Sequence, residues 1–383
     1  MSNQKVIFGS QIYKEMDVFF KEYSAKCILI VCGNSMSGLE VNDYFEKLPE
    51  RLKIKVEYYR EFTPNPQYSS VVDGVKFYHE KQCDAIVAVG GGSAIDVAKC
   101  IKLYAKLDKE EDYFKQKMIA SDIPFIVIPT TAGTGSEATS FAVIYRNGEK
   151  QSVSDVSCVP DLVCMQPEFL NSLPLYQRKV TMMDAFCHAI ESFWSVHSTN
   201  DSKAFSKQAI ELILKHKDAY IRNEEKGNEG MMKAAYLAGK AINIAKTTAG
   251  HAMGYKLTSL YGIAHGHAVA LCVSKLWPYM VLNSHDCVDL RGREYIESIF
   301  DELADILGVE NCMDAAKRFQ IFLDELQLEV PGVKNKEQYD ILIQSVNKER
   351  LANHPVRLTD ESINFLYHEI INRENEDIVE GED

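Results

Sequence analysis

The chain has 383 residues, of which 46% are hydrophobic and 25% charged, and its formal net charge is -13 at pH 7. This length suffices for two domains with separate cores. A negative electrostatic potential repels polyanions, which argues against nucleic acid or an anionic membrane as a general partner. No apolar stretch reaches membrane-spanning length, and the N-terminus lacks the pattern of a signal peptide. Ten cysteines without a CxxC pair predict buried thiols and a cytoplasmic location.

The first part of the chain alternates short apolar runs with longer amphipathic stretches. Strands are predicted at Cys27–Cys32, Ile54–Tyr59, Ala85–Val89, Phe125–Ile128 and Leu162–Met165, and helical patterns lie between the first four. This alternation is typical of right-handed βαβ units and a mainly parallel sheet covered on both faces. We therefore expect a doubly wound, Rossmann-like α/β domain over residues 1–170.

From about Leu173 onward the strand signals disappear. Apolar residues then recur at helical spacing in Asp201–Lys217, Gly230–Thr247, His265–Leu282 and Arg293–Leu307. We expect an all-α domain over residues 171–383. Because Pro167 and Pro174 mark the boundary and no flexible linker is present, a tight junction with a cleft is predicted there.

A glycine-rich turn follows one of the predicted strands. Ala85–Val89 runs into Gly90-Gly91-Gly92-Ser93, and the helical pattern Ala94–Tyr104 comes next. A helix N-terminus offers unpaired N–H donors and glycine permits close approach, so the turn favours a pyrophosphate. The alternative is an ordinary tight turn, since Ile95 occupies the last glycine position of a strict GxGxxG.

A second loop, Pro129–Glu137 (PTTAGTGSE), follows the predicted strand Phe125–Ile128. Its hydroxyls and glycines suit hydrogen bonding to phosphate, ribose or a nicotinamide amide. The two loops together indicate a nucleotide cofactor.

One carboxylate and three imidazoles complete a possible metal site, formed by Asp184, His188, His251 and His265. Asp184 and His188 are four residues apart on a predicted helix, Thr181–Trp194, so they share one face. His251 lies on the predicted helix Ala245–Tyr255, and His265 follows a break at Tyr261-Gly262. Such a set suits Fe(II), Zn(II), Co(II) or Ni(II). The alternative for each histidine is a buried core residue, and His265-Gly266-His267 also resembles the start of a metal hydrolase site.

Four motifs resemble those of a known family: Gly90–Asp96 (GGGSAID), Pro129–Glu137 (PTTAGTGSE), Asp184–Glu191 (DAFCHAIE) and His251–Gly266 (HAMGYKLTSLYGIAHG). The chain resembles the iron-containing, or group III, alcohol dehydrogenases, which share the dehydroquinate synthase-like fold. The resemblance covers nearly the whole chain.

The resemblance implies roles for particular residues. The metal ligands it implies are Asp184, His188, His251 and His265, and the catalytic group is Asp184, His265 and Tyr255. Candidate cofactor-binding residues are Gly33, Asn34, Ser35, Asn65, Pro66, Gly91, Gly92, Ser93, Asp96, Thr130, Thr131, Thr134, Ser136 and Lys150. Tyr255 stands where many members carry a histidine near the nicotinamide, so reprotonation through Tyr255, a ribose hydroxyl or water are all open.

The resemblance implies that the cofactor is NAD(H) or NADP(H). Members that select NAD often place an Asp at the end of the first strand, where this chain has Gly33. Glycine removes repulsion toward a 2′-phosphate, yet no Lys or Arg lies in Gly33–Gly38 to attract one. Both cofactors therefore remain possible.

The predicted reaction is reduction of a small aldehyde, with Fe(II) or Zn(II) as Lewis acid and NAD(P)H as hydride donor. The stretch Lys246–Leu271 looks most like the branch that reduces acidic aldehydes, sulfoacetaldehyde to isethionate or phosphonoacetaldehyde to 2-hydroxyethylphosphonate. Candidate cations for the acidic group are Arg178, Lys179, Lys246, Lys256 and Arg357, each of which is otherwise a solvated surface charge.

Four other functions would account for part or all of this pattern. A generalist short-chain alcohol dehydrogenase would use the same site. A metal-dependent hydrolase would not need the nucleotide loops, a nonredox lyase would consume no cofactor, and a non-catalytic nucleotide sensor would not need the metal. Family members are commonly homodimers or larger homo-oligomers, which is expected here as well.

Overall fold

The structure is a computed structural model that describes residues 4–333 and 337–373. The chain divides into two compact units. The first comprises Met1–Leu173 with Asp218–Gly239, and the second Pro174–Lys217 with Lys240–Asp383. The sequence gives no sign that 218–239 joins the first unit, because its helical pattern continues that of its neighbours.

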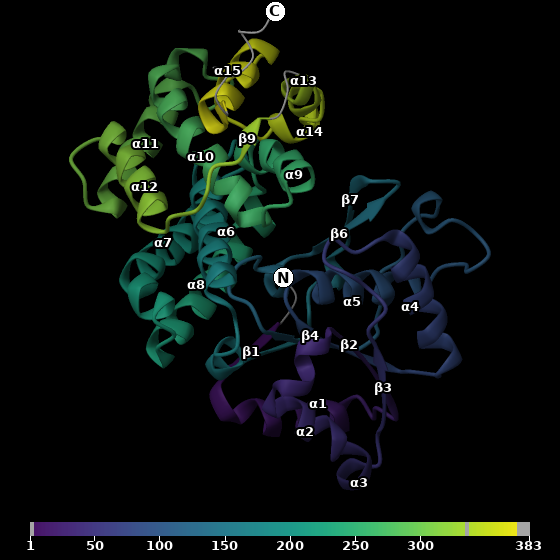
Figure 1. Cartoon of the computed structure of the whole chain (residues 1–383). Helices are drawn as coiled ribbons and strands as arrows, with labels where there is room; N and C mark the ends of the chain where they lie inside the picture. Colours follow the sequence, from purple (N-terminus) through teal and green to yellow (C-terminus); the bar gives the residue numbers. More distant parts are fainter. Residues whose placement is uncertain (1–3, 334–336, 374–383) are drawn as a thin grey trace, which may run out of the picture. The chain divides into compact units, whose positions relative to one another are not determined.

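The first unit is built on a six-stranded sheet in the order β1-β8-β5-β4-β2-β3, and Figure 1 shows helices packed around it. The strands are β1 (Lys5–Phe8), β2 (Cys27–Cys32), β3 (Lys55–Tyr59), β4 (Ala85–Gly90), β5 (Phe125–Pro129) and β8 (Leu162–Met165). Every pair in this sheet is parallel. The five predicted strands are confirmed to within one residue at each end, whereas β1 was missed.

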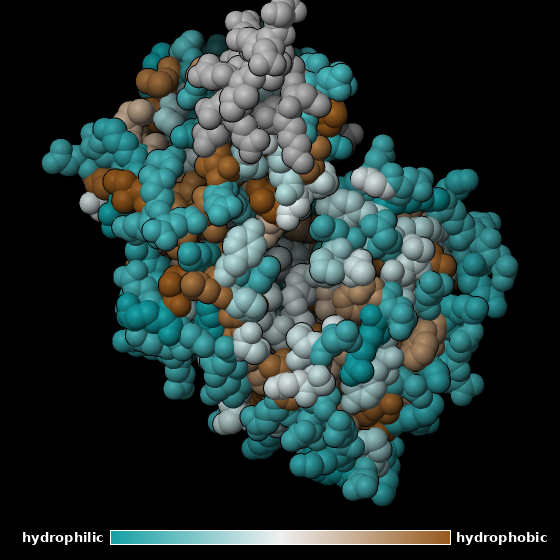
Figure 2. All heavy atoms as spheres, in the orientation of Figure 1, coloured by the Kyte–Doolittle hydropathy of each residue, from teal (hydrophilic) through white to brown (hydrophobic). Residues whose placement is uncertain are grey.

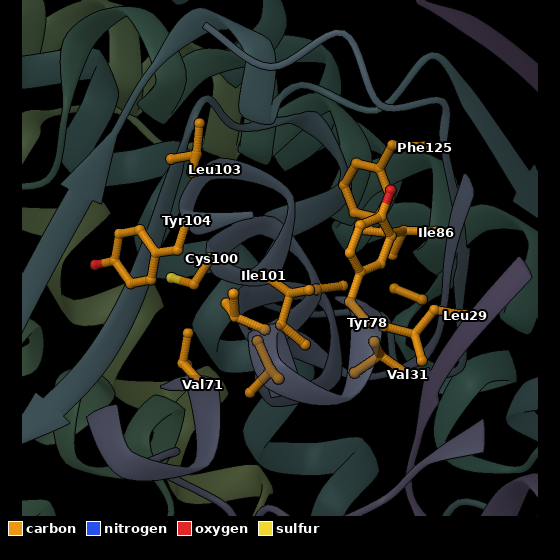
Figure 3. Packing of buried hydrophobic residues seen from close by; sticks show 14 of the residues in the cluster. Leu29, Val31, Val71, Tyr78, Ile86, Cys100, Ile101, Leu103, Tyr104 and Phe125 are labelled. Atoms are coloured by element: carbon orange, nitrogen blue, oxygen red, sulfur yellow. The ribbon is translucent and has the colours of Figure 1, made fainter. Parts of the chain in front are cut away.

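Helices cover both faces of the sheet, which makes the unit doubly wound as predicted. They are α1 (Ile12–Glu22), α2 (Glu40–Glu46), α3 (Leu48–Leu52), α4 (Tyr68–Glu80) and α5 (Gly92–Tyr104). Successive strand residues point to opposite faces, so Leu29 and Val31 pack with α4 and α5, as Figure 3 shows, while Ile28 and Ile30 pack with α1, α2 and α3. Both faces of the central strands are therefore buried.

An antiparallel hairpin, β6 (Phe141–Arg146) and β7 (Glu149–Ser154), completes the first unit. It turns at Asn147 and Gly148, which both have positive φ. The Tyr145 N–H donates to the carbonyl of Pro66, 2.8 Å away, which ties the hairpin to the segment after β3. The sequence analysis did not predict this hairpin.

The second half of the chain is helical, as expected. Its helices are α6 (Leu175–Trp194), α7 (Asn200–Ile221), α8 (Glu225–Ala245), α9 (Ala249–Tyr261), α10 (His265–Leu282), α11 (Arg293–Leu307), α12 (Cys312–Glu325), α13 (Glu337–Gln344), α14 (Lys348–Leu351) and α15 (Asp360–Ile370). Two-residue strands β9 (Gly332–Val333) and β10 (Asn372–Arg373) pair in parallel. In the second unit α10 packs against α6, α9, α12 and α15.

The predicted helices are present, but several of their boundaries differ from the prediction. α6 begins at Leu175 and α8 at Glu225, six and five residues before the predicted starts at Thr181 and Gly230. The predicted helix Ala245–Tyr255 is wrong at its start, because α8 ends at Ala245, Lys246 has a φ of 65° and α9 begins at Ala249. The predicted break after Tyr261 is confirmed, since Gly262 ends α9 in the left-handed region.

On the face drawn in Figure 2, hydrophilic residues predominate and hydrophobic ones form small scattered patches. Across residues 4–333 and 337–373, no helix combines the length and apolarity that a membrane crossing requires.

Candidate metal and cofactor sites

Three of the four predicted metal ligands converge in the second unit. Asp184 and His188 lie one turn apart on α6, and His251 lies in the first turn of α9. One potential ligand atom from each residue lies within 4.8 Å of those from the other two, and all three residues are buried. His265, the first residue of α10, lies close by, with its ring centroid 5.4 Å from that of His251.

The distances fit a divalent metal. Asp184 Oδ1 lies 3.7 Å from His251 Nε2 and 4.0 Å from His188 Nε2. In a tetrahedral shell with bonds of about 2.1 Å, ligand atoms are separated by about 3.4 Å. Asp184 Oδ1 and His251 Nε2 are both buried without a hydrogen-bond partner among the described residues. A cation between them would satisfy both atoms.

Glu191, one turn beyond His188 on α6, fixes the orientation of His251. Its side chain is fully buried, and its carboxylate hydrogen-bonds with His251 Nδ1. It also accepts hydrogen bonds from the Thr248 hydroxyl at 3.0 Å and from the His251 backbone N–H at 3.2 Å. Metal-binding histidines commonly make this contact, because it selects the tautomer whose other nitrogen faces the metal. Glu191 lies within the motif DAFCHAIE, but its role could not be predicted from the sequence.

Both buried carboxylates favour the ionised state. Burial opposes ionisation of Asp184, but the three imidazoles outweigh burial and lower its pKa. Burial likewise opposes ionisation of Glu191, yet contact with His251 lowers its pKa below the usual range. Among the described residues, neither carboxylate forms an ion pair with Lys or Arg. This buried group of side chains therefore presents two anionic carboxylates that a divalent cation would neutralise.

Two glycines allow the helices to approach this closely. A Cβ atom on Gly266, next to His265, would lie 2.0 Å from the carbonyl oxygen of Val180 on α6. A Cβ atom on Gly250, next to His251, would lie 2.4 Å from Glu191 Oε1. A larger residue beside His251 or His265 would therefore push α9 or α10 away from α6.

Tyr255 lies one turn after His251 on α9 and stacks on His265, with ring centroids 5.0 Å apart and planes 4° apart. Arg350, on α14, donates a hydrogen bond to the Tyr255 hydroxyl, and its guanidinium lies 4.6 Å from the Tyr255 ring centroid. The sequence analysis did not select Arg350, which is 95 residues away along the chain.

The cations that were predicted to bind the substrate's acidic group lie in different surroundings. Arg178 is buried in α6, and the Lys179 ammonium donates to the Leu326 carbonyl at 2.7 Å. Lys246 and Lys256 are half-buried, and Arg357 is exposed. His267 does not belong to the group formed by Asp184, His188 and His251. Its Nδ1 lies 3.2 Å from the Tyr176 hydroxyl.

In the first unit, the predicted cofactor loops follow adjacent strands. Gly33 comes directly after β2, Gly91 after β4 and Thr130 after β5, while Asn65 and Pro66 lie in the segment between β3 and α4. Because β2 pairs with β4, and β4 with β5, in parallel, these loops share one edge of the sheet. Dinucleotides bind at the carboxyl ends of such strands, where the order reverses.

The loops after β4 and β5 also contact each other. Thr130 N–H donates to the Gly90 carbonyl at 3.0 Å. Cβ atoms on Gly91 and Gly92 would lie 3.0 Å and 2.9 Å from the side chains of Thr131 and Thr134, respectively. Gly91 caps α5, and Ser93 lies in its first turn, where backbone donors have no helical acceptor.

A buried lysine holds the second loop. The Lys99 ammonium, on α5, donates to the carbonyls of Ser136, Thr139 and Phe141 at 2.6 to 2.8 Å. Burial lowers the pKa of Lys99, although nearby Asp96 opposes that shift. The role of Lys99 was not predicted, because a lysine on a helix normally reaches solvent.

Asp96 and Lys150 lie close to this arrangement. Asp96 accepts hydrogen bonds from the Ser136 hydroxyl at 2.6 Å and from the Val143 N–H at 3.0 Å. Burial raises the Asp96 pKa, and the charge of Lys150 on β7 is among the groups that oppose the rise. Both oxygens of Asp96 thus bind the protein itself, linking α5, the second loop and β6.

Two family descriptions account for most of the chain: "Iron-containing alcohol dehydrogenase" matches residues 3–167, and "Fe-containing alcohol dehydrogenase family, C-terminal" matches residues 179–371. The chain therefore belongs to the iron-containing alcohol dehydrogenase family and is an oxidoreductase of that family.

The relatives of this chain include an alcohol dehydrogenase and a phosphonoacetaldehyde reductase. The chain is 30% identical over 376 residues to alcohol dehydrogenase 4 of Schizosaccharomyces pombe, a match covering 94% of this chain and 86% of the relative. It is 30% identical to the phosphonoacetaldehyde reductase of Streptomyces viridochromogenes, covering 75% of this chain and 76% of that one.

Solved structures confirm the predicted fold. The iron-containing alcohol dehydrogenase of Thermotoga maritima superposes with a TM-score of 0.83 at 26% identity, covering 97% of this chain and 98% of its own. The sulfoacetaldehyde reductase of Bifidobacterium kashiwanohense, in complex with NAD+, also has a TM-score of 0.83, at 24% identity and 97% coverage of both chains.

Proposed function

We propose that this chain is a metal-dependent, NAD(P)H-linked reductase that converts a small acidic aldehyde, such as sulfoacetaldehyde or phosphonoacetaldehyde, to its alcohol. The observation that carries the proposal is the buried convergence of Asp184, His188 and His251 in a member of a dehydrogenase family. The aldehyde gains a hydride from NAD(P)H and a proton, giving the alcohol and NAD(P)+.

The chain's own residues would bind the two reactive groups. Asp184, His188, His251 and His265 would hold Fe(II) or Zn(II), and Glu191 would orient His251. The candidate cofactor residues after β2, β3, β4 and β5, with Lys150 on β7, would hold NAD(P)H. A bound divalent metal supplies Lewis-acid polarisation of a carbonyl, and the nicotinamide supplies the hydride.

Tyr255 is the proposed proton donor. Its hydroxyl oxygen accepts the hydrogen bond from Arg350, and a phenol that accepts through its oxygen can also donate its own proton, here to the nascent alkoxide. Stacking on His265 keeps the ring beside the proposed ligands. Tyr255, Asp184 and His265 thus form the proposed catalytic group.

Arg350 supports the choice of an acidic substrate. Its guanidinium is permanently charged, and it lies beside Tyr255, next to the proposed ligand His265. No described carboxylate forms an ion pair with it. In a chain of net charge -13, a guanidinium that has no carboxylate partner among the described residues is the group that would attract a sulfonate, phosphonate or carboxylate.

The test compares aldehydes. Loss of NAD(P)H absorbance is followed with metal-reconstituted protein and sulfoacetaldehyde, phosphonoacetaldehyde or propanal. A higher kcat/KM for an acidic aldehyde is expected. Equal values would support the generalist alcohol dehydrogenase instead, and no oxidation with any aldehyde would overturn the reductase. Chemical conversion without net NAD(P)H consumption would indicate the hydrolase or the lyase.

We also propose a cytoplasmic location and a homodimer or larger homo-oligomer. All ten cysteines are free, which suits a reducing compartment. Light scattering on the purified chain tests the oligomer, since a monomeric mass would contradict it.

A further inference from the structure

We infer that Arg60 binds the 2′-phosphate of NADPH, so that the enzyme prefers NADPH to NADH. The inference rests on the proposed function, which leaves the choice of cofactor open. It concerns the end of β2, where the strand leads into Gly33, and the end of the neighbouring strand β3, which is followed by Arg60.

Strand order locates the adenosine end of the cofactor. The glycine-rich loop that suits a pyrophosphate follows β4, and β2 is the neighbour of β4 on the side away from β5. In doubly wound dinucleotide-binding sheets, the strand beside the pyrophosphate loop presents the group that reads the adenosine ribose. That group is an acid in NAD-binding sites, whereas an arginine nearby accommodates the 2′-phosphate of NADP.

The end of β2 carries no acid. Gly33, Asn34 and Ser35 follow Cys32, and the side chains of Asn34 and Ser35 are exposed. A Cβ atom on Gly33 would meet nothing within 4 Å. There is consequently room beside Gly33, and nothing in this turn repels a phosphate.

A cation lies at the same place, although it is distant along the chain. The Nε–H of Arg60 donates to Cys32 Sγ, 3.5 Å away, and its guanidinium lies 5.0 Å from the Tyr58 ring centroid. The parallel pairing of β2 with β3 brings the two strand ends together, with Val31 opposite Tyr59. Arg60 thus supplies the positive charge that the segment Gly33–Gly38 lacks.

The remaining donors of Arg60 suit a phosphate. Its side chain is exposed, and among the described residues no carboxylate forms an ion pair with it. The Cys32 contact fixes Nε and the Tyr58 ring supports the guanidinium plane, so both Nη atoms can donate to phosphate oxygens. An adenosine ribose with only hydroxyl groups would leave this charge without a partner.

The first experiment measures binding without turnover. Thermal shift and calorimetry compare 2′,5′-ADP with 5′-AMP on the full chain. We expect 2′,5′-ADP to bind about 10- to 100-fold more tightly, as charged bidentate contacts typically allow. In Arg60→Met that difference should disappear. Arg222→Met is the matched control, because Arg222 is an exposed arginine of the same unit that pairs with Glu224, and it should retain the difference.

A second variant tests whether the cofactor preference can be shifted toward NADH. Gly33→Asp places a carboxylate where the backbone has an ordinary φ of -83° and a side chain has space. It should lower the ratio of kcat/KM for NADPH to that for NADH by about 10-fold or more, because the carboxylate repels the 2′-phosphate and accepts from ribose hydroxyls.

Equal binding of 2′,5′-ADP and 5′-AMP to the wild-type chain would overturn the inference. So would a preference for 2′,5′-ADP that survives Arg60→Met. If NADH supports aldehyde reduction in either case, the proposed function stands without this inference. If 2′,5′-ADP binds selectively through Arg60 but no aldehyde is reduced, the reductase fails while the 2′-phosphate site stands.

Discussion

The carboxylate of Glu191 contacts Nδ1 of His251, and both side chains are buried, so Nε2 of the same imidazole faces Asp184. Replacing the carboxylate by an amide should weaken this orientation. We predict that Glu191→Gln lowers metal affinity by about 10- to 100-fold, measured by competition with a chelator of known affinity. Glu294→Gln, at an exposed position on α11, is the control. Unchanged affinity in Glu191→Gln would mean that the contact does not support a metal ligand.

Tyr255→Phe should retain the ring that stacks on His265 but lose the hydroxyl. If the phenol donates the proton, kcat for aldehyde reduction falls by about 100-fold while metal content stays constant. Tyr255→His restores a proton donor and should recover part of the loss. Steady-state kinetics together with metal analysis separate this effect from damage to the metal site. A wild-type kcat in Tyr255→Phe would mean that a ribose hydroxyl or water donates the proton.

Arg350→Met should change substrate preference. The ratio of kcat/KM for sulfoacetaldehyde to that for propanal is expected to fall by about 10- to 100-fold, because a charged hydrogen bond to the acidic group is lost. Arg318→Met, which removes an exposed arginine of the same unit, is the control. An equal loss of kcat/KM for both aldehydes would show that Arg350 supports Tyr255 but does not bind the substrate's acidic group.

Glu137 should make the folded state less stable as the pH rises. Burial raises its pKa from 4.5 to about 7. The protonated acid is thus favoured on folding, and its contribution is complete below pH 4.5 and lost as the pH approaches 7. The loss is about 3 kcal/mol for a shift of this size.

Chemical denaturation at pH 5 and pH 8 checks this prediction by comparing the free energy of unfolding of the wild type with that of Glu137→Gln. Between these pH values, the stability of the wild type relative to Glu137→Gln should fall, because the amide cannot ionise. Glu149→Gln, at an exposed position on β7, should follow the wild type. A difference between wild type and Glu137→Gln that does not vary with pH would contradict the raised pKa.

The central strands could be predicted because their burial on both faces produces continuous apolar runs, as in Cys27–Cys32 and Ala85–Val89. The strand β1 could not, since it is four residues long, lies at an edge and is not fully buried. The hairpin of β6 and β7 lacked a clear signal because β7, EKQSVS, is largely polar.

The helical spacing of Asp184 and His188 made the candidate metal site visible in the sequence, since four residues place both side chains on one face. Contacts between distant segments were not visible. Glu191 and Lys99 act through burial against other elements. Arg60 reaches the end of β2, and Arg350 reaches α9, only through the fold.

The most direct test of the account is metal dependence of NAD(P)H oxidation. The purified chain is stripped with a chelator and titrated with Fe(II) or Zn(II), while aldehyde-dependent loss of NAD(P)H absorbance and bound metal are measured together. We predict that stripping abolishes turnover and that activity returns in proportion to metal bound, up to one ion per chain, with Asp184→Ala and His265→Ala recovering neither. Undiminished turnover in the stripped protein would contradict the account.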